Sequence, residues 1–198
     1  MTCRMLLSFM ALLLSIAVMV HATDRAVHVE GRVAEVIRAS QGFNPVESAG
    51  LFVGIRHFDD SEFIDVPFAV DDAVDLAHLF VLELDLIAPQ QVLLALSGEP
   101  QKPQSVQALQ ALRQAGAKRV EAQKSKILRH LRHQAAATGK RGLFVVTFAT
   151  HGFSAQGRDF LVGRDTERGF IQDTGLKVGI VFDQAAQAAP TGPARCVS

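Results

Sequence analysis

Short runs of apolar residues divide the chain after Gly50. Three of them, at residues 51–55, 91–96 and 143–149, are rich in Val, Ile, Leu and Phe and show no alternation of polar with apolar positions. Unbroken apolar runs of this length are typical of strands that are buried on both faces, as in a parallel sheet covered by helices. We therefore expect these three runs to be parallel strands of the core.

Amphipathic patterns between the runs predict helices. Residues 70–86 place apolar positions three and four apart and carry Asp71 and Asp72 near the start, where acidic groups favour a helix N-terminus. Residues 105–115 form a second such pattern, which Gly116 closes. The same spacing predicts helices over residues 121–137, with Ile127, Leu128, Leu131 and Ala135 inward, and over residues 178–189.

The alternation of strands and helices predicts one α/β domain, a three-layer sandwich whose mostly parallel central sheet is flanked by helices. We expect it over residues 50–189, after a weakly patterned lead-in over residues 23–49. Residues 153–165 contain a turn signal between short apolar pieces, which predicts a hairpin or an edge strand. The tail at residues 190–198 (PTGPARCVS) has two prolines and no period, which excludes a buried strand.

The first 22 residues have the three parts of a secretory signal. Arg4 gives a positive start, residues 5–20 are apolar apart from two Ser, and Val20-His21-Ala22 places small residues where a signal peptidase cleaves. We expect cleavage after Ala22, export to the periplasm or out of the cell, and no stable membrane insertion of the mature chain. The alternative is a retained anchor, because sixteen apolar residues fall just below the length that spans a bilayer.

Composition limits the classes of partner. Lys plus Arg and Asp plus Glu are each 20, so the net charge is zero and the positive surplus typical of nucleic-acid binding is absent. The chain has no Trp and no Tyr, which leaves little material for stacking on bases. Its glycines form no phosphate-binding fingerprint. The sequence predicts no nucleic-acid partner and no cofactor.

His151 and Gly152 directly follow the third apolar run, in the segment ATHGFS. Reactive groups gather at the carboxyl ends of the strands in an open parallel sheet. An imidazole there can act as a general base, and the N–H of Gly152 can bind the oxyanion of an acyl-transfer intermediate. The alternative from the residues alone is a histidine that ends a strand and caps the neighbouring loop.

Several segments, in order, resemble the caspase-like cysteine peptidases, the group that includes the metacaspases. The strand Leu-Phe-Val-Gly-Ile at residues 51–55 is followed by a polar loop and by Phe-Ala-Val-Asp-Asp-Ala-Val-Asp-Leu-Ala at residues 68–77. Within it, Asp72-Ala73 is similar to the pair that opens the first helix of the family. Residues 143–152 resemble the strand that delivers the catalytic histidine, and residues 160–165 resemble the strand that succeeds it. The resemblance covers the chain from residue 50 to about residue 183.

This resemblance implies a cysteine endopeptidase that cleaves a peptide or protein substrate with a Cys–His dyad. It makes His151 the base and the Gly152 N–H one arm of the oxyanion hole, with the nucleophilic Cys about 50 residues downstream of the His. Cys196, 45 residues after His151, is the candidate, and it is the single cysteine that remains once the signal is removed. It follows Pro193-Ala-Arg instead of the apolar strand that carries this cysteine in the family. By the family's pattern the domain is incomplete, and we expect weak or no turnover.

A non-catalytic binding or adaptor domain on the same scaffold is therefore the alternative function. The sequence sets neither the residue preferred before the scissile bond nor the oligomeric state. Arg56, at the end of the first apolar run, is a candidate substitute for the specificity arginine of the caspases, with a surface ion pair as the other interpretation.

Two further clusters are weaker candidates, and we expect no metal site. His130 and His133 are three apart on a predicted helix, but no third ligand accompanies them and their basic neighbours favour a solvated face. An acidic cluster lacks the spacing of a calcium loop, which favours a loop kept polar for solubility. Its residues are Asp59, Asp60, Glu62 and Asp65.

Overall fold

The computed structural model describes residues 35 and 42–188, and Gly42 begins one compact unit. The expected signal over residues 1–22, most of the lead-in and Cys196 lie outside the described residues. Within these ranges, no helix is long and apolar enough to cross a membrane.

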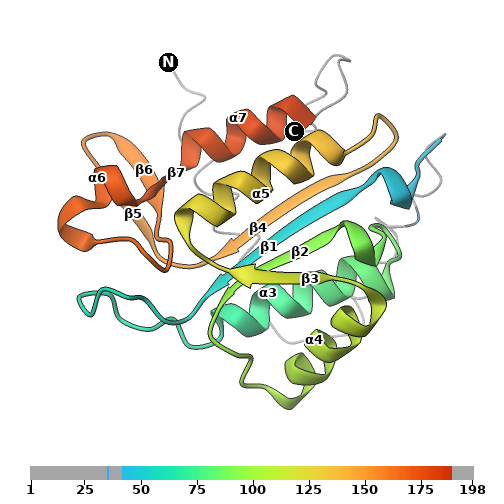
Figure 1. Ribbon diagram of the computed structural model, residues 1–198, viewed down its shortest axis with the longest axis horizontal. Helices are drawn as coiled ribbons and strands as arrows, with labels where there is room; N and C mark the ends of the chain where they lie inside the picture. The colour runs from blue at the N-terminus through green and yellow to red at the C-terminus, as the bar shows by residue number, and fades with distance from the viewer. Residues whose placement is uncertain (1–34, 36–41, 189–198) are drawn as a thin grey trace. The chain divides into compact units, whose positions relative to one another are not determined.

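Four parallel strands form the central sheet: β1 (Ala49–Ile55), β2 (Val92–Ser97), β3 (Lys118–Glu121) and β4 (Phe144–Ala149), in the order β3-β2-β1-β4 (Figure 1). The three apolar runs supply β1, β2 and β4. All residues of β1 and β2 are buried, because strands flank them on both sides and helices cover both faces. The expected α/β fold with a parallel core is confirmed.

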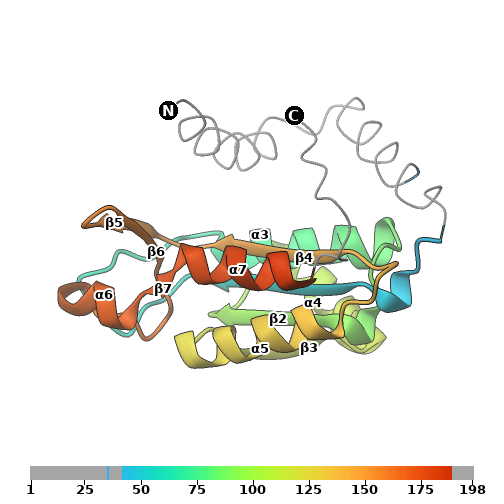
Figure 2. The same cartoon turned by 90° about the horizontal axis from the view of Figure 1, so that it is seen from above.

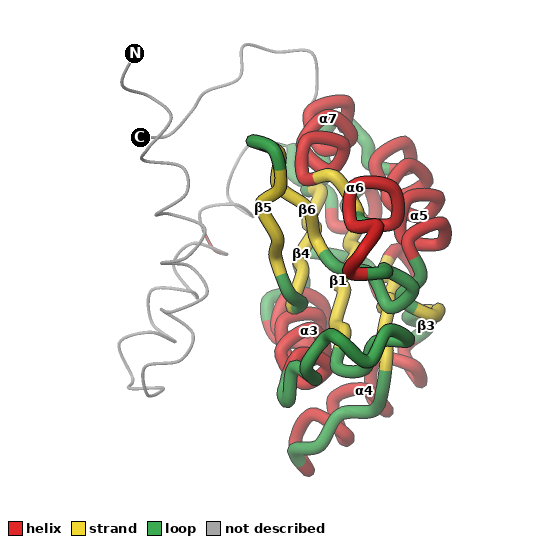
Figure 3. Tube along the Cα trace, turned by 90° about the vertical axis from the view of Figure 1, so that its left-hand side faces the viewer, coloured by secondary structure: helices red, strands yellow, loops and turns green. Residues whose placement is uncertain are grey.

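Helices form the two outer layers. The helices α3 (Ala69–His78) and α4 (Pro103–Ala115) cover one face of the sheet, whereas α5 (Lys124–Ala137) and α7 (Val178–Ala188) cover the other (Figures 1 and 3). Ile127 and Leu131 of α5 are buried against β1 and β2 as the sequence predicts. Shorter turns complete the chain: Pro45–Glu47, Leu79–Glu83 (a wide π-helical continuation of α3), Pro89–Gln91 and Arg168–Phe170.

Two expectations about the sheet are corrected. Residues 144–149 are half-exposed along their whole length and not buried on both faces, because β4 is the outermost strand of the described sheet. Residues 118–121, which lie between the helices predicted over residues 105–115 and 121–137 and include the first residue of the latter, form β3 instead. The sequence Lys-Arg-Val-Glu has only one apolar residue, as an edge strand permits.

A second, antiparallel sheet follows the central one. Strands β5 (Gly152–Ala155) and β6 (Arg158–Leu161) form a hairpin, and β7 (Leu176–Lys177) pairs with β6. Of the hairpin and the edge strand expected within residues 153–165, the hairpin is confirmed, with Gln156 and Gly157 both at positive φ in its turn. Between β6 and β7 lies the short helix α6 (Ile171–Thr174). This small sheet lies at the end of the central sheet where β1 and β4 finish (Figure 2).

Close packing holds α3 against β1. Gly54 of β1 has no room for a side chain, because a Cβ there would lie 2.5 Å from the Ala69 carbonyl oxygen and 2.8 Å from the Ala73 Cβ. Asp71, predicted to favour the helix start, has a further role in the structure. It is buried, and its Oδ1 accepts hydrogen bonds from the backbone N–H groups of Gln101 at 2.9 Å and Lys102 at 2.7 Å. The carboxylate thereby fixes the segment that leads into α4.

Candidate active site

His151 lies directly beyond the carboxyl end of β4, as the sequence predicts. Its ring stacks on two phenylalanines of the loop that follows β1. The ring centroid is 5.2 Å from that of Phe58, with planes at 30°, and 6.2 Å from that of Phe63, with planes at 26°. Phe58 and Phe63 also pack against Phe160 of β6 in a small apolar cluster. The loop after β1 stacks on the imidazole and is itself packed against the small sheet, so both segments fix the position of the ring.

A backbone carbonyl orients the imidazole. The Nε2 atom of His151 lies 2.6 Å from the carbonyl oxygen of Ile64, which can only accept a hydrogen bond. Nε2 therefore carries the hydrogen in the neutral ring, and Nδ1 keeps a lone pair that can take a proton. A base held in one tautomer by a third group is the arrangement that activates a thiol or hydroxyl nucleophile.

The backbone N–H of Gly152 lies beside this base and bonds no other backbone group in the described part of the chain. Val162 N–H donates to the His151 carbonyl at 3.0 Å, which places residues 151 and 162, directly beyond β5 and β6, in the register of a hydrogen-bonded pair. Because such pairs alternate along antiparallel strands, Gly152 and Leu161 form a non-hydrogen-bonded pair, and the Gly152 N–H points away from β6. Gly152 is exposed, and the atom nearest to a Cβ built there would be 4.0 Å away. An oxygen atom can approach this N–H.

Residues 163–168 anchor the loop that carries Phe58, Phe63 and Ile64. The Arg164 guanidinium donates to Asp59 at 2.9 Å and also bonds Glu121 at the end of β3. These two carboxylates raise the pKa of Arg164. The Arg168 N–H donates to Asp60 at 2.8 Å, and this bond is the main reason that the pKa of Asp60 lies below its usual value.

The acidic cluster is thus tied to protein partners. Asp65 pairs with His57 at 2.8 Å and Glu62 lies 4.0 Å from Arg168, in addition to the contacts of Asp59 and Asp60. Within the described ranges, no group of three or more His, Cys, Asp or Glu side chains is arranged to hold a metal ion, and His130 and His133 belong to no such group. The cluster acts as the anchor of the loop beside His151.

Arg56 makes no surface ion pair with any described residue, contrary to one of the two interpretations. With the Gln101 side-chain oxygen turned toward it, both terminal nitrogens of the Arg56 guanidinium donate to that oxygen at 2.8 Å, whereas Nε is buried without a partner in the described part of the chain. Arg56 therefore links the end of β1 to the segment that Asp71 fixes.

The structure brings together His151 and Gly152 but leaves Cys196 outside the described residues. Phe58, Phe63 and Ile64 were not singled out by the sequence. The two Phe could be found from the aromatic spacing of HFDDSEF, but Ile64 acts through its carbonyl, which carries no sequence signal.

A comparison with protein-family models finds no match to this sequence, and no curated protein is significantly similar to it.

Proposed function

We propose that this protein is a caspase-like cysteine endopeptidase domain in which His151 is the general base. The observation that carries the proposal is the contact between His151 Nε2 and the Ile64 carbonyl, which leaves Nδ1 as the proton acceptor. The order of motifs that resembles the family and the exposed Gly152, whose N–H points away from β6, support the same assignment.

In the proposed reaction, Nδ1 of His151 takes the proton of the nucleophilic thiol, for which Cys196 is the candidate. The thiolate adds to the carbonyl carbon of the scissile peptide bond, and the Gly152 N–H donates to the resulting oxyanion. The imidazolium then returns the proton to the leaving amine as the C–N bond breaks. Water hydrolyses the thioester, with His151 again as the base, and releases the second product and the free thiol.

A thiol that shares a proton with an imidazole is present as thiolate at lower pH than a free thiol. The test is the rate at which iodoacetamide alkylates Cys196 between about pH 5.5 and pH 9, measured by mass spectrometry on the full chain with Cys3 replaced by Ser. The dyad predicts a rate at the acidic end well above that of a free thiol. That excess should disappear in His151→Ala and persist in His133→Ala, a matched change on the surface of α5.

Hydrolysis of fluorogenic peptides with Arg, Lys or Asp before the scissile bond provides the second readout. We expect turnover by the 198-residue chain to be weak, because the sequence Pro193-Ala-Arg precedes Cys196 where the resembled family has an apolar run. Turnover lost in both His151→Ala and Cys196→Ala would identify Cys196 as the nucleophile. Identical alkylation of Cys196 with and without His151 would refute the dyad.

One observation favours a second function, a non-catalytic binding or adaptor domain. Residues 42–188, which build the whole described scaffold, contain no cysteine. Such a domain would bind a peptide of a partner protein at the same end of the sheet without cleaving it. Binding of the fluorogenic peptides with no cleavage and with ordinary reactivity of Cys196 would support it.

A further inference from the structure

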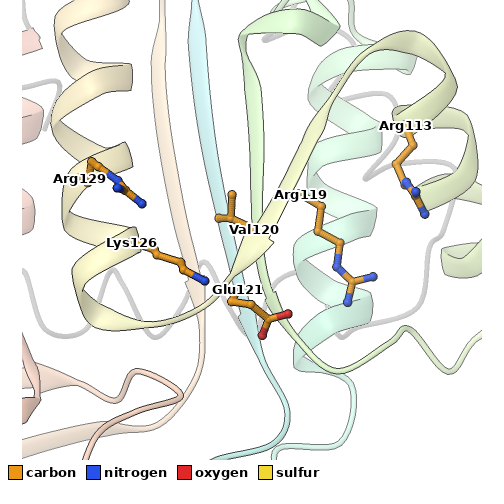
Figure 4. Close-up of a pocket in the computed structure, with 6 residues that line it drawn as sticks. All are labelled: Arg113, Arg119, Val120, Glu121, Lys126 and Arg129. Carbon is orange, nitrogen blue, oxygen red and sulfur yellow. The ribbon is translucent and has the colours of Figure 1, made fainter.

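A cationic groove of about 580 Å³ lies along β3, on the opposite edge of the sheet from β4. We call it the β3 groove. Figure 4 shows its lining: basic side chains of α4 and α5 stand on the two sides of β3, and Val120 lies between them. The residues that line it are Arg113, Arg119, Val120, Glu121, Lys126 and Arg129.

The charge of the groove is largely unneutralised. Its one lining carboxylate, Glu121, bonds Arg164, and Arg119 pairs with Glu99 at 2.7 Å. In the part of the chain that the structure describes, no carboxylate lies within 4.0 Å of the side-chain nitrogens of the other three cations: Arg113, Lys126 and Arg129.

A nearby histidine, His130, is partly buried among positive charges. The pKa of His130 is lowered, first by burial and then by Arg129, His133 and Lys118. Positive charge thus accumulates where α5 passes β3, and an anionic ligand would be attracted there.

The backbone of β3 supplies a second, independent feature. β3 pairs with β2 alone, and its N–H and C=O groups form no hydrogen bond with any other described segment. Every second residue of an edge strand points these groups outward, where an added strand can bond them. With four residues, β3 offers an edge about 13 Å long.

The positions of the cations determine how the acidic residues must be spaced along the ligand. Arg113 stands on α4, on one side of the strand, and Lys126 and Arg129 stand on α5, on the other side (Figure 4). Successive side chains of a strand point to opposite faces. An added strand therefore reaches both sets of cations only when its acidic residues are consecutive, since alternating acidic residues would all meet one face.

We propose that the β3 groove binds an extended acidic segment of a partner protein, which adds as a strand to the free edge of β3 and places consecutive Asp or Glu side chains against Arg113 on one side and Lys126 and Arg129 on the other. This docking surface is separate from His151 and does not depend on the proposed peptidase activity.

The test uses two fluorescein-labelled peptides of identical composition and the full chain. The first, Ser-Val-Glu-Glu-Glu-Val-Ser, has consecutive acids, and the second, Glu-Ser-Glu-Val-Glu-Ser-Val, has alternating acids. Fluorescence anisotropy in 50 mM and 200 mM NaCl gives their affinities. We expect the first peptide to bind at least about fivefold more tightly, and to weaken in the higher salt because the contacts are ionic and exposed.

The double variant Lys126→Glu/Arg129→Glu should weaken the first peptide by about tenfold or more, because attraction becomes repulsion at two sites. The matched control, Lys140→Glu/Arg158→Glu, changes the charge equally at exposed positions outside the groove and should leave the affinity unchanged.

Hydrogen exchange distinguishes strand addition from simple attraction of anions. Peptide binding should slow the exchange of amides within residues 118–121, because an added strand bonds the outward N–H groups. Equal affinities for the two peptides, unchanged exchange of these amides, or equally tight binding of a ten-nucleotide oligothymidylate would each overturn the proposal, the last in favour of a general polyanion surface.

Discussion

Replacement of Asp71 tests whether its two hydrogen bonds to backbone N–H groups stabilise the segment that leads into α4. Its side chain is 1% exposed, and one oxygen accepts both the Gln101 and Lys102 N–H groups, at 2.9 Å and 2.7 Å. In Asp71→Ala both N–H groups lose their acceptor, at a cost of about 1–3 kcal/mol for each buried donor. Because Gln101 is exposed and Lys102 is half-exposed, water can reach the freed donors, and we expect a total loss of about 2–3 kcal/mol.

Asp71→Asn separates the role of the acceptor from that of the charge. The amide keeps an oxygen at the position of Oδ1, and its NH₂ group replaces Oδ2, which is buried without a partner in the described part of the chain. We expect this variant to lose less than half of what Asp71→Ala loses. Asp75→Ala, on the same helix, is the matched control, since Asp75 forms no hydrogen bond or ion pair with any described side chain, and it should stay within about 0.5 kcal/mol of the native chain.

Urea unfolding followed by far-ultraviolet circular dichroism measures these free energies, because the chain has no Trp or Tyr to report by fluorescence. A loss below about 1 kcal/mol in Asp71→Ala, less than the cost of a single unsatisfied buried donor, would refute the reasoning. So would an Asn variant as unstable as the Ala variant.

Three further outcomes follow from the structure, and a fourth follows from the sequence alone. Gly54→Ala should lower the free energy of unfolding by about 1–3 kcal/mol, because its Cβ would overlap α3, whereas Gly179→Ala, in α7 with no atom within 4 Å of the added Cβ, should raise it by about 0.5–1 kcal/mol in the same urea assay. Because the pKa of His130 is lowered in the folded chain, the unfolded chain binds the proton first, so stability should fall as the pH decreases through about 6.5. That fall should be shallower in His130→Gln, and equal slopes for the two chains would contradict the assignment. Arg164→Met should cost only about 1 kcal/mol or less overall, since its ion pairs are exposed, yet it should speed hydrogen exchange within residues 57–64, and unchanged exchange there would show that other contacts hold the loop. N-terminal sequencing of protein recovered from the cell envelope should begin at Thr23, and an intact Met1 in the membrane fraction would indicate an anchor instead.

The spacing of apolar residues was sufficient to predict the strands and helices that bury a continuous apolar face. β1 and β2 are unbroken apolar runs, and α5 has its inward residues at helical spacing, so the layers of the sandwich follow from the sequence. β3 could not be predicted in this way, because an edge strand of four residues with three charged side chains has neither an apolar run nor an alternating pattern. Its pairing with β2 is a tertiary effect of the crossover from α4.

The candidate site, too, could be predicted from the sequence only in part. His151 and Gly152 could be located because a parallel sheet presents its chemistry where its strands end. The groups that orient His151 could not, since a carbonyl at Ile64 and two stacked rings depend on how a loop 87 residues earlier in the chain folds back over the hairpin. The double contact of Asp71 with Gln101 and Lys102 is also non-local, because it joins residues 30 and 31 positions apart.

During synthesis, Arg164 is made long after the loop that it anchors. The loop that orients His151 is made early, but its ionic anchor arrives 105 residues later, when Arg164 meets Asp59. Contacts of such long sequence separation form late in folding, because the intervening chain must first be closed into a loop. A nascent chain of 151–163 residues thus has the acceptor carbonyl and the histidine but lacks this anchor. We expect the imidazole to be held in its single tautomer only after Arg164 has been made and has reached Asp59, which delays any reactivity of His151 until that contact has formed.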